Sequence, residues 1–193
     1  MISNGDAKPA RPLPDERRLV EMARSGNADA FGQLYDAYVD RVYRYIIYRV
    51  SDGPTAEDLT SQVFLKAWQN LDRYRPKGPI LAWFYAIARN TVIDHYRTFK
   101  QTVSLDDAAP IPAQDDKLDE LIEHQYEKRS LQDALQYLTE DQREVIVLKF
   151  ISEFDTDQIA SKMGKSEGAI RALQMRALQT LAKVIKKDAI EEK

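Results

Sequence analysis

The stretch TDQIASKMGKSEGAIRALQMRAL, residues 156–178, decides the fold of the C-terminal half of this chain. Two segments with the apolar spacing of helices meet at Gly164, and a glycine readily adopts the left-handed conformation that ends a helix. Ser166 follows, where its hydroxyl can cap the start of the next helix. This order of residues predicts a helix-turn-helix.

The second helix of the motif is predicted to have two different faces. The face that we expect to pack on a core consists of Ile170, Leu173, Ala177, Leu181 and Val184. The opposite face places the small residues Gly168 and Ala172 beside Arg171 and other cations. Small residues allow close approach to a groove, cations attract phosphates, and an arginine can donate to a guanine edge. This face is therefore either a DNA-binding surface or the solvated basic side of a helical bundle.

The rest of the chain shows helical spacing almost throughout. Its 193 residues include only 7 glycines, and the 8 prolines fall at segment edges or in linkers. Because no alternating strand pattern with hairpin turns occurs, we predict an all-α protein. Thr139 and Gln142 predict a capping box at the start of one helix. The predicted helices cover about residues 15–24, 28–50, 55–71, 80–99, 118–138, 140–152, 156–163 and 167–186.

An acidic stretch without apolar periodicity divides the chain. Residues 101–116, QTVSLDDAAPIPAQDD, contain two prolines, and residues 99–127 carry two lysines against eight carboxylates in a chain of net charge −3. We interpret this stretch as a linker between two small helical modules, either a solvated spacer or a functional segment. The predicted organisation is a tail at 1–14, a module at 15–99, a linker at 100–117, a helix-turn-helix module at 118–187 and a tail at 188–193.

Composition excludes several classes of function. The chain has no cysteine, which rules out disulfides, thiolate metal sites and a cysteine nucleophile. Its two histidines, His95 and His124, lie far apart, and no phosphate-binding glycine loop is present, so we expect no enzyme, metal or cofactor. No apolar run approaches the roughly 20 residues that span a bilayer, and the N-terminus lacks a signal-peptide core. We expect a cytoplasmic protein without membrane insertion.

Residues 55–71, TAEDLTSQVFLKAWQNL, predict a helix with one apolar and one polar face. The apolar face consists of Ala56, Thr60, Val63, Phe64, Ala67 and Leu71. The opposite face consists of Asp58, Gln62, Leu65 and Gln69. An exposed leucine among polar groups either has no role, because scattered apolar surface residues are normal, or marks a partner surface.

Residues 80–99, ILAWFYAIARNTVIDHYRTF, interleave aromatic and basic side chains on one predicted helix. Such interleaving suits single-stranded nucleic acid, because exposed bases stack on rings and phosphates pair with cations. Most of the aromatic residues here, including Trp83 and Phe84, are nevertheless expected to be core. The tyrosines between positions 35 and 48 are assigned to packing.

Taken together, these segments resemble a bacterial RNA polymerase sigma factor of the extracytoplasmic-function (ECF) group of the sigma-70 family. AEDLTSQVFLKAWQNLDRYRP, residues 56–76, resembles region 2.2, and AWFYAIARNTVIDHYR, residues 82–97, resembles regions 2.3–2.4. Region 4 is matched by LTEDQREVIVLKFISEFDTDQIASKMGKSEGAIRALQMRAL, residues 138–178. The resemblance covers about residues 28–181, and several motifs in order are more specific than one helix-turn-helix.

The resemblance implies a promoter-recognition factor with a sigma region 2-like bundle and a region 4-like helix-turn-helix. Such a factor binds the β′ clamp helices and the β flap of core RNA polymerase, directs it to promoters and helps melt the −10 element. An anti-sigma factor is a further implied partner. The linker would run toward the RNA exit path, where its acidity could mimic nucleic acid.

The resemblance also assigns site residues. Polymerase binding is carried over to Asp58, Gln62, Leu65 and Gln69. Contacts to the −10 element are carried over to Tyr74, Arg75, Lys77, Tyr85, Arg89, Asn90, Asp94 and Arg97. Contacts to the −35 element are carried over to Lys165, Ser166, Glu167, Gly168, Arg171, Ala172, Met175 and Arg176.

Two departures from the family pattern lie in the reading helix. Lys165 follows the turn glycine where the family often has isoleucine, and Ala172-Leu173-Gln174 stands where it often has Ser-Arg-Leu, which removes one base-side cation. One alternative function is a sigma-like decoy that sequesters an anti-sigma factor, although such decoys usually carry a receiver domain for which this chain has no room. Another is a dimeric helix-turn-helix regulator of duplex DNA, and an enzyme is the weakest alternative.

Overall fold

The structure is a computed structural model that describes residues 13, 15–75, 78–103 and 131–191, and within these ranges every regular element is a helix. The all-α prediction is therefore confirmed. The elements are α1 (Glu16–Arg24), α2 (Ala28–Val50), α3 (Gly53–Asn70), η1 (Leu71–Arg73), α4 (Ile80–Val103), α6 (Glu140–Ile146), η2 (Val147–Ile151), α7 (Thr156–Met163) and α8 (Glu167–Glu191). Most of the predicted linker and of the predicted helix at 118–138 lies outside the described residues, although residues 131–136 are helical.

Local sequence signals set where several helices begin. The Asn27 side chain accepts a hydrogen bond from the backbone of Ala30, 2.9 Å away, at the start of α2. The predicted capping box of α6 is confirmed, since Gln142 Oε1 accepts from Thr139 N at 3.1 Å and Thr139 Oγ1 accepts from Gln142 N at 3.4 Å. These bonds satisfy amide groups that a helix leaves unpaired at its first turn.

The predicted turn between α7 and α8 is also confirmed. Gly164 ends α7 with a φ of 63°, in the left-handed region. Ser166 Oγ then accepts a hydrogen bond from Ala169 N at 3.2 Å and caps α8. The turn therefore follows from two residues that the sequence identifies.

The predicted helix at 140–152 differs from the structure in its second half. The α-helix ends at Ile146, and the chain continues through the wider, π-helical turn η2. Ser152 N donates to Val147 O at 2.9 Å, a bond that spans five residues instead of four. Val147 and Leu148 in this turn are both buried, and they continue the buried run of Val145 and Ile146 in α6.

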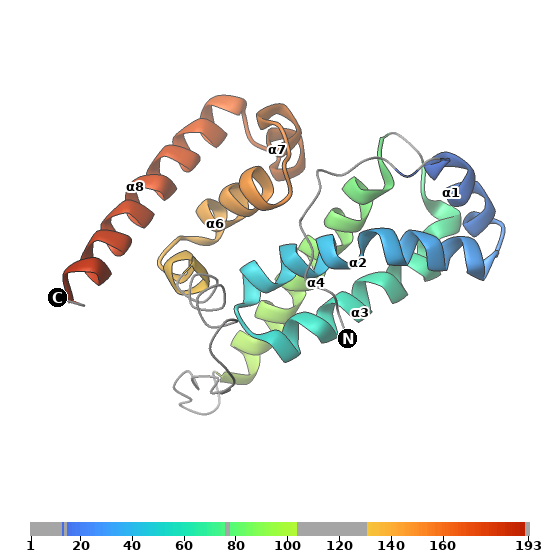
Figure 1. Cartoon of the computed structure of the whole chain (residues 1–193), viewed down its shortest axis with the longest axis horizontal. Helices are drawn as coiled ribbons and strands as arrows, with labels where there is room; N and C mark the ends of the chain where they lie inside the picture. The colour runs from blue at the N-terminus through green and yellow to red at the C-terminus, as the bar shows by residue number, and fades with distance from the viewer. Residues whose placement is uncertain (1–12, 14, 76–77, 104–130, 192–193) are drawn as a thin grey trace.

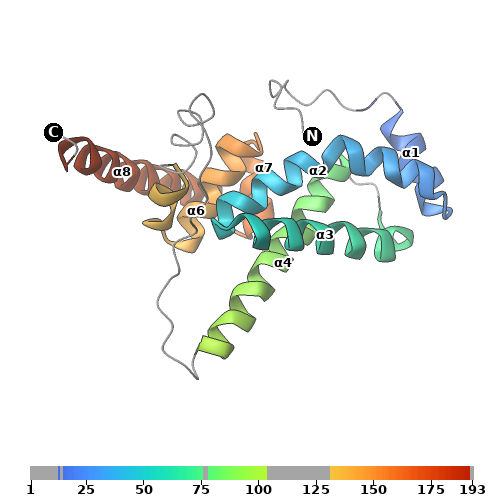
Figure 2. The same cartoon turned by 60° about the horizontal axis from the view of Figure 1, so that its bottom comes forward.

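The first four helices form one bundle in which α2 and α3 run side by side and α4 crosses them, as Figures 1 and 2 show together. Phe84 of α4 is fully buried at the crossing. Its ring centroid lies 5.1 Å from that of Phe64 in α3 and 5.8 Å from that of Tyr38 in α2. Aromatic packing thus fixes the three helices to one another.

Helices α6, α7 and α8 form the second group. The apolar stripe predicted for α8 packs inward, with Ile170 and Ala177 fully buried. Part of this stripe closes a small core of its own, in which Ala177 and Leu181 meet Leu135 and Leu138.

The two groups pack against each other. Val145 of α6, Leu148 of η2 and Ile159 of α7 belong to the same continuous apolar cluster as Phe84 and Val92 of α4. Figure 1 shows the α6–α8 group against one end of the α2–α4 bundle, with the far end of α8 projecting away from it.

Two glycine substitutions test the turn. Gly164→Ala places a Cβ in open space but on a backbone with φ of +63°, so we expect it to lower the free energy of unfolding by about 1–2 kcal/mol. Gly32→Ala is the matched control, because Gly32 lies inside α2 and its added Cβ would also be in open space. This substitution should raise the free energy of unfolding by about 0.5–1 kcal/mol. Urea unfolding measures both changes, and shifts of the same sign would contradict the assigned turn.

Candidate nucleic-acid interface

The polar face of α3 is exposed along its length. Its opposite face is buried, with Ala56, Val63 and Ala67 at 0% exposure, so the predicted separation of faces is confirmed. All four residues expected to bind polymerase lie on the exposed face: Asp58, Gln62, Leu65 and Gln69. The side of α3 away from the core is therefore free for a partner.

A shallow apolar groove lies beside Leu65. Its lining consists of Ala28, Phe31, Phe64, Leu65 and Trp68. Leu65 is 56% exposed and Trp68 37% exposed, and the rings of Phe31 and Trp68 pack at a tilt of 53° with their centroids 4.9 Å apart. Sequence reasoning identified the leucine but missed Phe31 and Trp68. Trp68 was the available signal for this groove. It comes three residues after Leu65 and therefore lies on the same side of the helix.

The candidate reading face of α8 is largely exposed. Ser166, Glu167, Gly168, Arg171, Met175 and Arg176 are exposed, whereas Lys165 and Ala172 are half-buried. Glu167 Oε2 lies 2.6 Å from Arg171 Nη2, and Arg176 Nε donates to the backbone of Ala172 at 3.2 Å. Lys165 Nζ lies 3.0 Å from Asp141 Oδ2 of α6. The cations of this face are thus oriented by neighbours on the same module.

The residues expected at the −10 element fall into two sets. The first set is exposed and consists of Arg75, Asn90, Asp94 and Arg97. Lys77 lies outside the described residues. The second set consists of Tyr74, Tyr85 and Arg89, which other side chains cover to different degrees.

Tyr74 and Tyr85 are buried. The sequence predicts both residues on an open DNA-binding face. The Tyr74 hydroxyl donates to Gly78 O at 2.9 Å, and its ring lies 4.9 Å from that of Trp83. The ring of Tyr85 lies 5.4 Å from that of Phe154, which follows η2. Burial raises the pKa of both tyrosines. Helical periodicity identifies faces of one helix, so it does not reveal that a distant segment covers α4.

A buried ionic cluster joins α6 to α2 and α4. Glu144 is 3% exposed, and its Oε2 lies 2.7 Å from Nη1 of the equally buried Arg49. Its Oε1 lies 3.7 Å from Nε of Arg89 on α4. The Tyr45 hydroxyl donates to both carboxylate oxygens, at 2.9 and 3.0 Å. Burial, and then the charge of Glu144, raise the pKa of Tyr45 well above its usual value.

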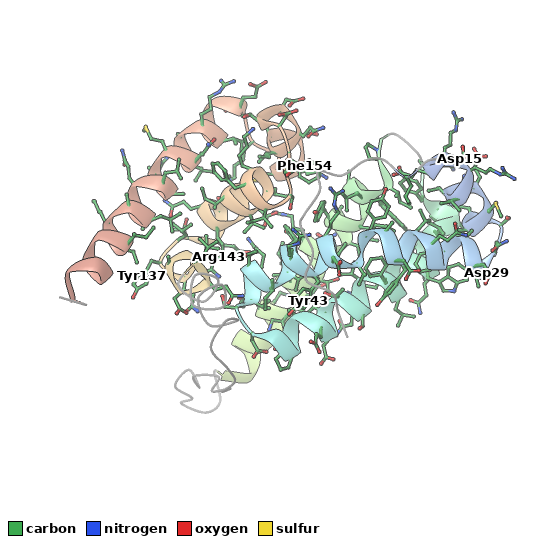
Figure 3. All side chains as sticks on the ribbon, in the orientation of Figure 1. Asp15, Asp29, Tyr43, Tyr137, Arg143 and Phe154 are labelled. Atoms are coloured by element: carbon green, nitrogen blue, oxygen red, sulfur yellow. The ribbon has the colours of Figure 1, made fainter. Side chains whose placement is uncertain are left out.

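Further polar contacts surround this cluster. Arg143 Nη1 donates to Arg49 O at 3.1 Å, and Lys162 Nζ donates to Ala82 O at the start of α4 at 3.0 Å. The Lys162 ammonium also lies 4.5 Å from the centre of the Phe154 ring. Burial lowers the pKa of both Arg143 and Lys162. Figure 3 shows Arg143 where α6 faces the end of α2, and Phe154 where the chain between η2 and α7 approaches α4.

Other kinds of site find no support in the described part of the chain. No group of three or more histidine, aspartate or glutamate side chains gathers there as metal ligands do. None of the helices in those residues is long and apolar enough to cross a membrane.

Comparison with known proteins identifies the family. The family model for Sigma-70 region 2 matches residues 34–102 of this chain. The family model for Sigma-70, region 4 matches residues 128–181. The chain is 40% identical over 174 residues to the ECF RNA polymerase sigma factor BldN of Streptomyces coelicolor, an alignment that covers 89% of this chain and 66% of BldN. It is 32% identical over 170 residues to the RNA polymerase sigma factor CarQ of Myxococcus xanthus, covering 86% of this chain and 95% of CarQ.

The chain is an ECF sigma factor of the sigma-70 family. Among solved structures it is similar to CnrH in complex with the cytosolic domain of CnrY, with a TM-score of 0.69, 25% identity and coverage of 90% of this chain and 98% of CnrH. The family resemblance drawn from the sequence is therefore confirmed. The roles of the individual site residues stay predictions.

The exposed pair on the candidate reading face of α8 should contribute little to folding. Arg171 and Glu167 have side chains 65% and 49% exposed, and an exposed pair four residues apart on a helix stabilises by about 0.3–0.5 kcal/mol. We expect Arg171→Ala to lower the free energy of unfolding by no more than about 0.5 kcal/mol, measured by urea unfolding. A loss of several kcal/mol would mean that the residue has a structural role and would disqualify it as a probe of DNA binding.

Proposed function

We propose that this sigma factor binds core RNA polymerase through α3, reads the −35 element with α8, and recognises and helps melt the −10 element with α4. It would act in the cytoplasm. It would recognise the promoter, while the polymerase would catalyse RNA synthesis. The observation that carries the proposal is the exposed face of α3, where Leu65 and Trp68 stand beside polar side chains on a helix whose other side is fully packed. An apolar groove with a polar border fits the side of a partner helix.

The proposed role of α8 is supported by shape and charge. A Cβ added at Gly168 would meet nothing closer than Ser166 Oγ at 4.0 Å, so the backbone at the start of α8 is open to close approach. Arg171 and Arg176 are both exposed and flank the face that carries Gly168 and Ala172. Arginine side chains in this position can donate to phosphate oxygens and to the edge of a guanine in the major groove.

The proposed role of α4 is supported by its exposed polar residues. Asn90, Asp94 and Arg97 recur at intervals of three and four residues and therefore share one side of the helix. Arg75 is exposed on the segment that leads into α4. We propose that residues 72–79 capture a base that leaves the duplex, where contacts to the base must offset the few kcal/mol lost on unstacking.

An anti-sigma factor is the proposed regulatory partner. CnrH, whose fold this chain shares, was solved with the cytosolic domain of CnrY. The groove beside Leu65 and Trp68 is the surface through which we propose that such a partner competes with polymerase.

The polymerase contact is tested by Leu65→Ser. We expect it to weaken binding to core polymerase about tenfold, because it removes an exposed apolar side chain from the centre of the proposed contact. Ser61→Ala is the matched control, since Ser61 is exposed on the same helix and its hydroxyl donates to Glu57 O of its own helix. Co-elution and fluorescence titration with core polymerase measure the effect. If the unmodified chain does not bind core polymerase, the proposed function is wrong.

The division of work between α3 and α8 is tested by transcription in vitro. Arg171→Ala should lower transcription from a promoter with a −35 element about tenfold, because the lost contact to a base is worth roughly 1–3 kcal/mol, and it should leave polymerase binding unchanged. Asp58→Ala should weaken polymerase binding and leave binding of the −35 element unchanged. Ser161→Ala, exposed on α7, is the control. Equal losses for both variants in both assays would contradict the division.

A further inference from the structure

Helix α1 lies beside the segment at residues 72–79, which the proposed function assigns to base capture. Figure 1 shows α1 at the end of the bundle where α3 finishes, and α1 contacts η1 there. Val20 and Ala23 of α1 are buried, so the helix is packed firmly on the bundle. It precedes the residues that the family model for region 2 matches, and the family resemblance gives it no role. Its first and last residues nevertheless reach the two ends of this segment.

The first residue of α1 holds the start of α4. Glu16 Oε1 accepts a hydrogen bond from the backbone amide of Ile80 at 3.1 Å. Ile80 is the first residue of α4, and the amides of a first turn have no partner within their own helix. The dipole of the helix also favours a carboxylate at this position. Glu16 therefore caps α4 from 64 residues away in the chain.

Tyr38 of α2 fixes the direction of the Glu16 carboxylate. Its hydroxyl donates to Glu16 Oε2, and its buried ring lies 5.8 Å from that of Phe84. Burial, and then the hydrogen bond to Glu16, raise the pKa of Tyr38 well above its usual value, so the hydroxyl remains a donor. Because one oxygen is held by the core, the other is presented to Ile80 in a defined position.

The last residue of α1 holds the opposite end of the segment. Arg24 Nη2 donates to Asp72 O in η1 at 3.3 Å. The Nε atom of the same guanidinium is buried and has no hydrogen-bond partner among the described residues. An arginine that kept its head group in water would avoid this cost. The Arg24 side chain is thus committed to the backbone where the segment begins.

A third bond joins the two ends of the segment directly. The Tyr74 hydroxyl donates to Gly78 O at 2.9 Å, and the Tyr74 ring packs on Trp83 of α4 with centroids 4.9 Å apart. Arg75 is exposed and takes part in none of the three bonds. The bonds therefore fix the backbone and leave this cation available to a ligand.

We propose that α1 is a brace that holds residues 72–75 and 78–80 in a fixed arrangement, and that Glu16 and Arg24 are positioning residues for recognition of the −10 element. The inference rests on the proposed function, in which the same segment captures a base. Residues that are already ordered lose little conformational freedom when a base arrives, so more of the contact energy offsets unstacking. The brace itself is a property of the free chain.

Amide exchange in the free full chain tests the brace. Glu16→Ala removes the acceptor of the Ile80 amide, so exchange at Ile80, followed by NMR, should become about fivefold faster. Glu16→Gln keeps a side-chain oxygen for that amide and should stay within about twofold of the parent. Glu21→Ala is the matched control, because Glu21 is exposed on the same helix and pairs with Arg17 of α1 at 3.4 Å. No change in Glu16→Ala, or an equal change in Glu21→Ala, would overturn the brace.

Arg24→Ala separates loosening from misfolding. It removes the bond to Asp72 O, so the Tyr74 amide, which donates to Leu71 O at 3.1 Å at the end of η1, should exchange about threefold faster. Arg17→Ala, exposed on the same helix, is its control. Circular dichroism should show the helix content of the parent in every variant. Unchanged exchange at Tyr74 in Arg24→Ala would mean that α1 holds one end only and would overturn the brace.

Binding of promoter DNA by the holoenzyme tests what the brace positions. The probe is the fluorescein-labelled non-template strand, across the −10 element, of a promoter at which the chain and core polymerase start transcription. A strand with the same bases in scrambled order is the reference. Glu16→Ala should lower the preference for the promoter strand about fivefold and leave binding of the scrambled strand and of core polymerase unchanged. Glu16→Gln should keep the preference.

The outcomes distinguish the brace from the proposed function. If exchange at Ile80 rises and the preference for the promoter strand does not fall, α1 does not position the segment for DNA and the proposal fails. Salt should weaken binding equally for the parent and Glu16→Ala, and a changed slope would show that Glu16 acts on phosphates and not through the segment. A parent holoenzyme without any preference would instead overturn the proposed function and leave the exchange result standing.

Discussion

The carboxylate of Glu144 sets where the two helical groups of this sigma factor meet. It accepts hydrogen bonds from the Tyr45 hydroxyl and lies 2.7 Å from Arg49 Nη1, and both partners are themselves buried. A shift by one helical turn would leave a buried charge without its partner, which costs far more than the pair contributes. This contact thus fixes the register of α6 on the bundle, within the apolar cluster that Val145 and Leu148 share with Phe84.

Helices α3 and α8 share a design in which one face is packed and the opposite face is left free. Small or apolar residues at regular spacing fix the rotation of each helix, as Ala67 and Val63 do in α3 and Ala177 does in α8. Once the rotation is fixed, Leu65 and Arg171 must point outward. Packing energy therefore determines the direction of groups that contribute nothing to the core themselves.

The sequence predicts most of this fold because its signals are local. The caps at Thr139 and Ser166, the turn at Gly164 and both faces of α3 and α8 depend on residues within one or two helical turns. The burial of Tyr85 and the cluster at Glu144 were missed, because Tyr45 and Glu144 are 99 residues apart in the chain. A faint signal existed, since Arg49 continues the buried stripe of Val42, Tyr45 and Ile46, where a charge needs a partner.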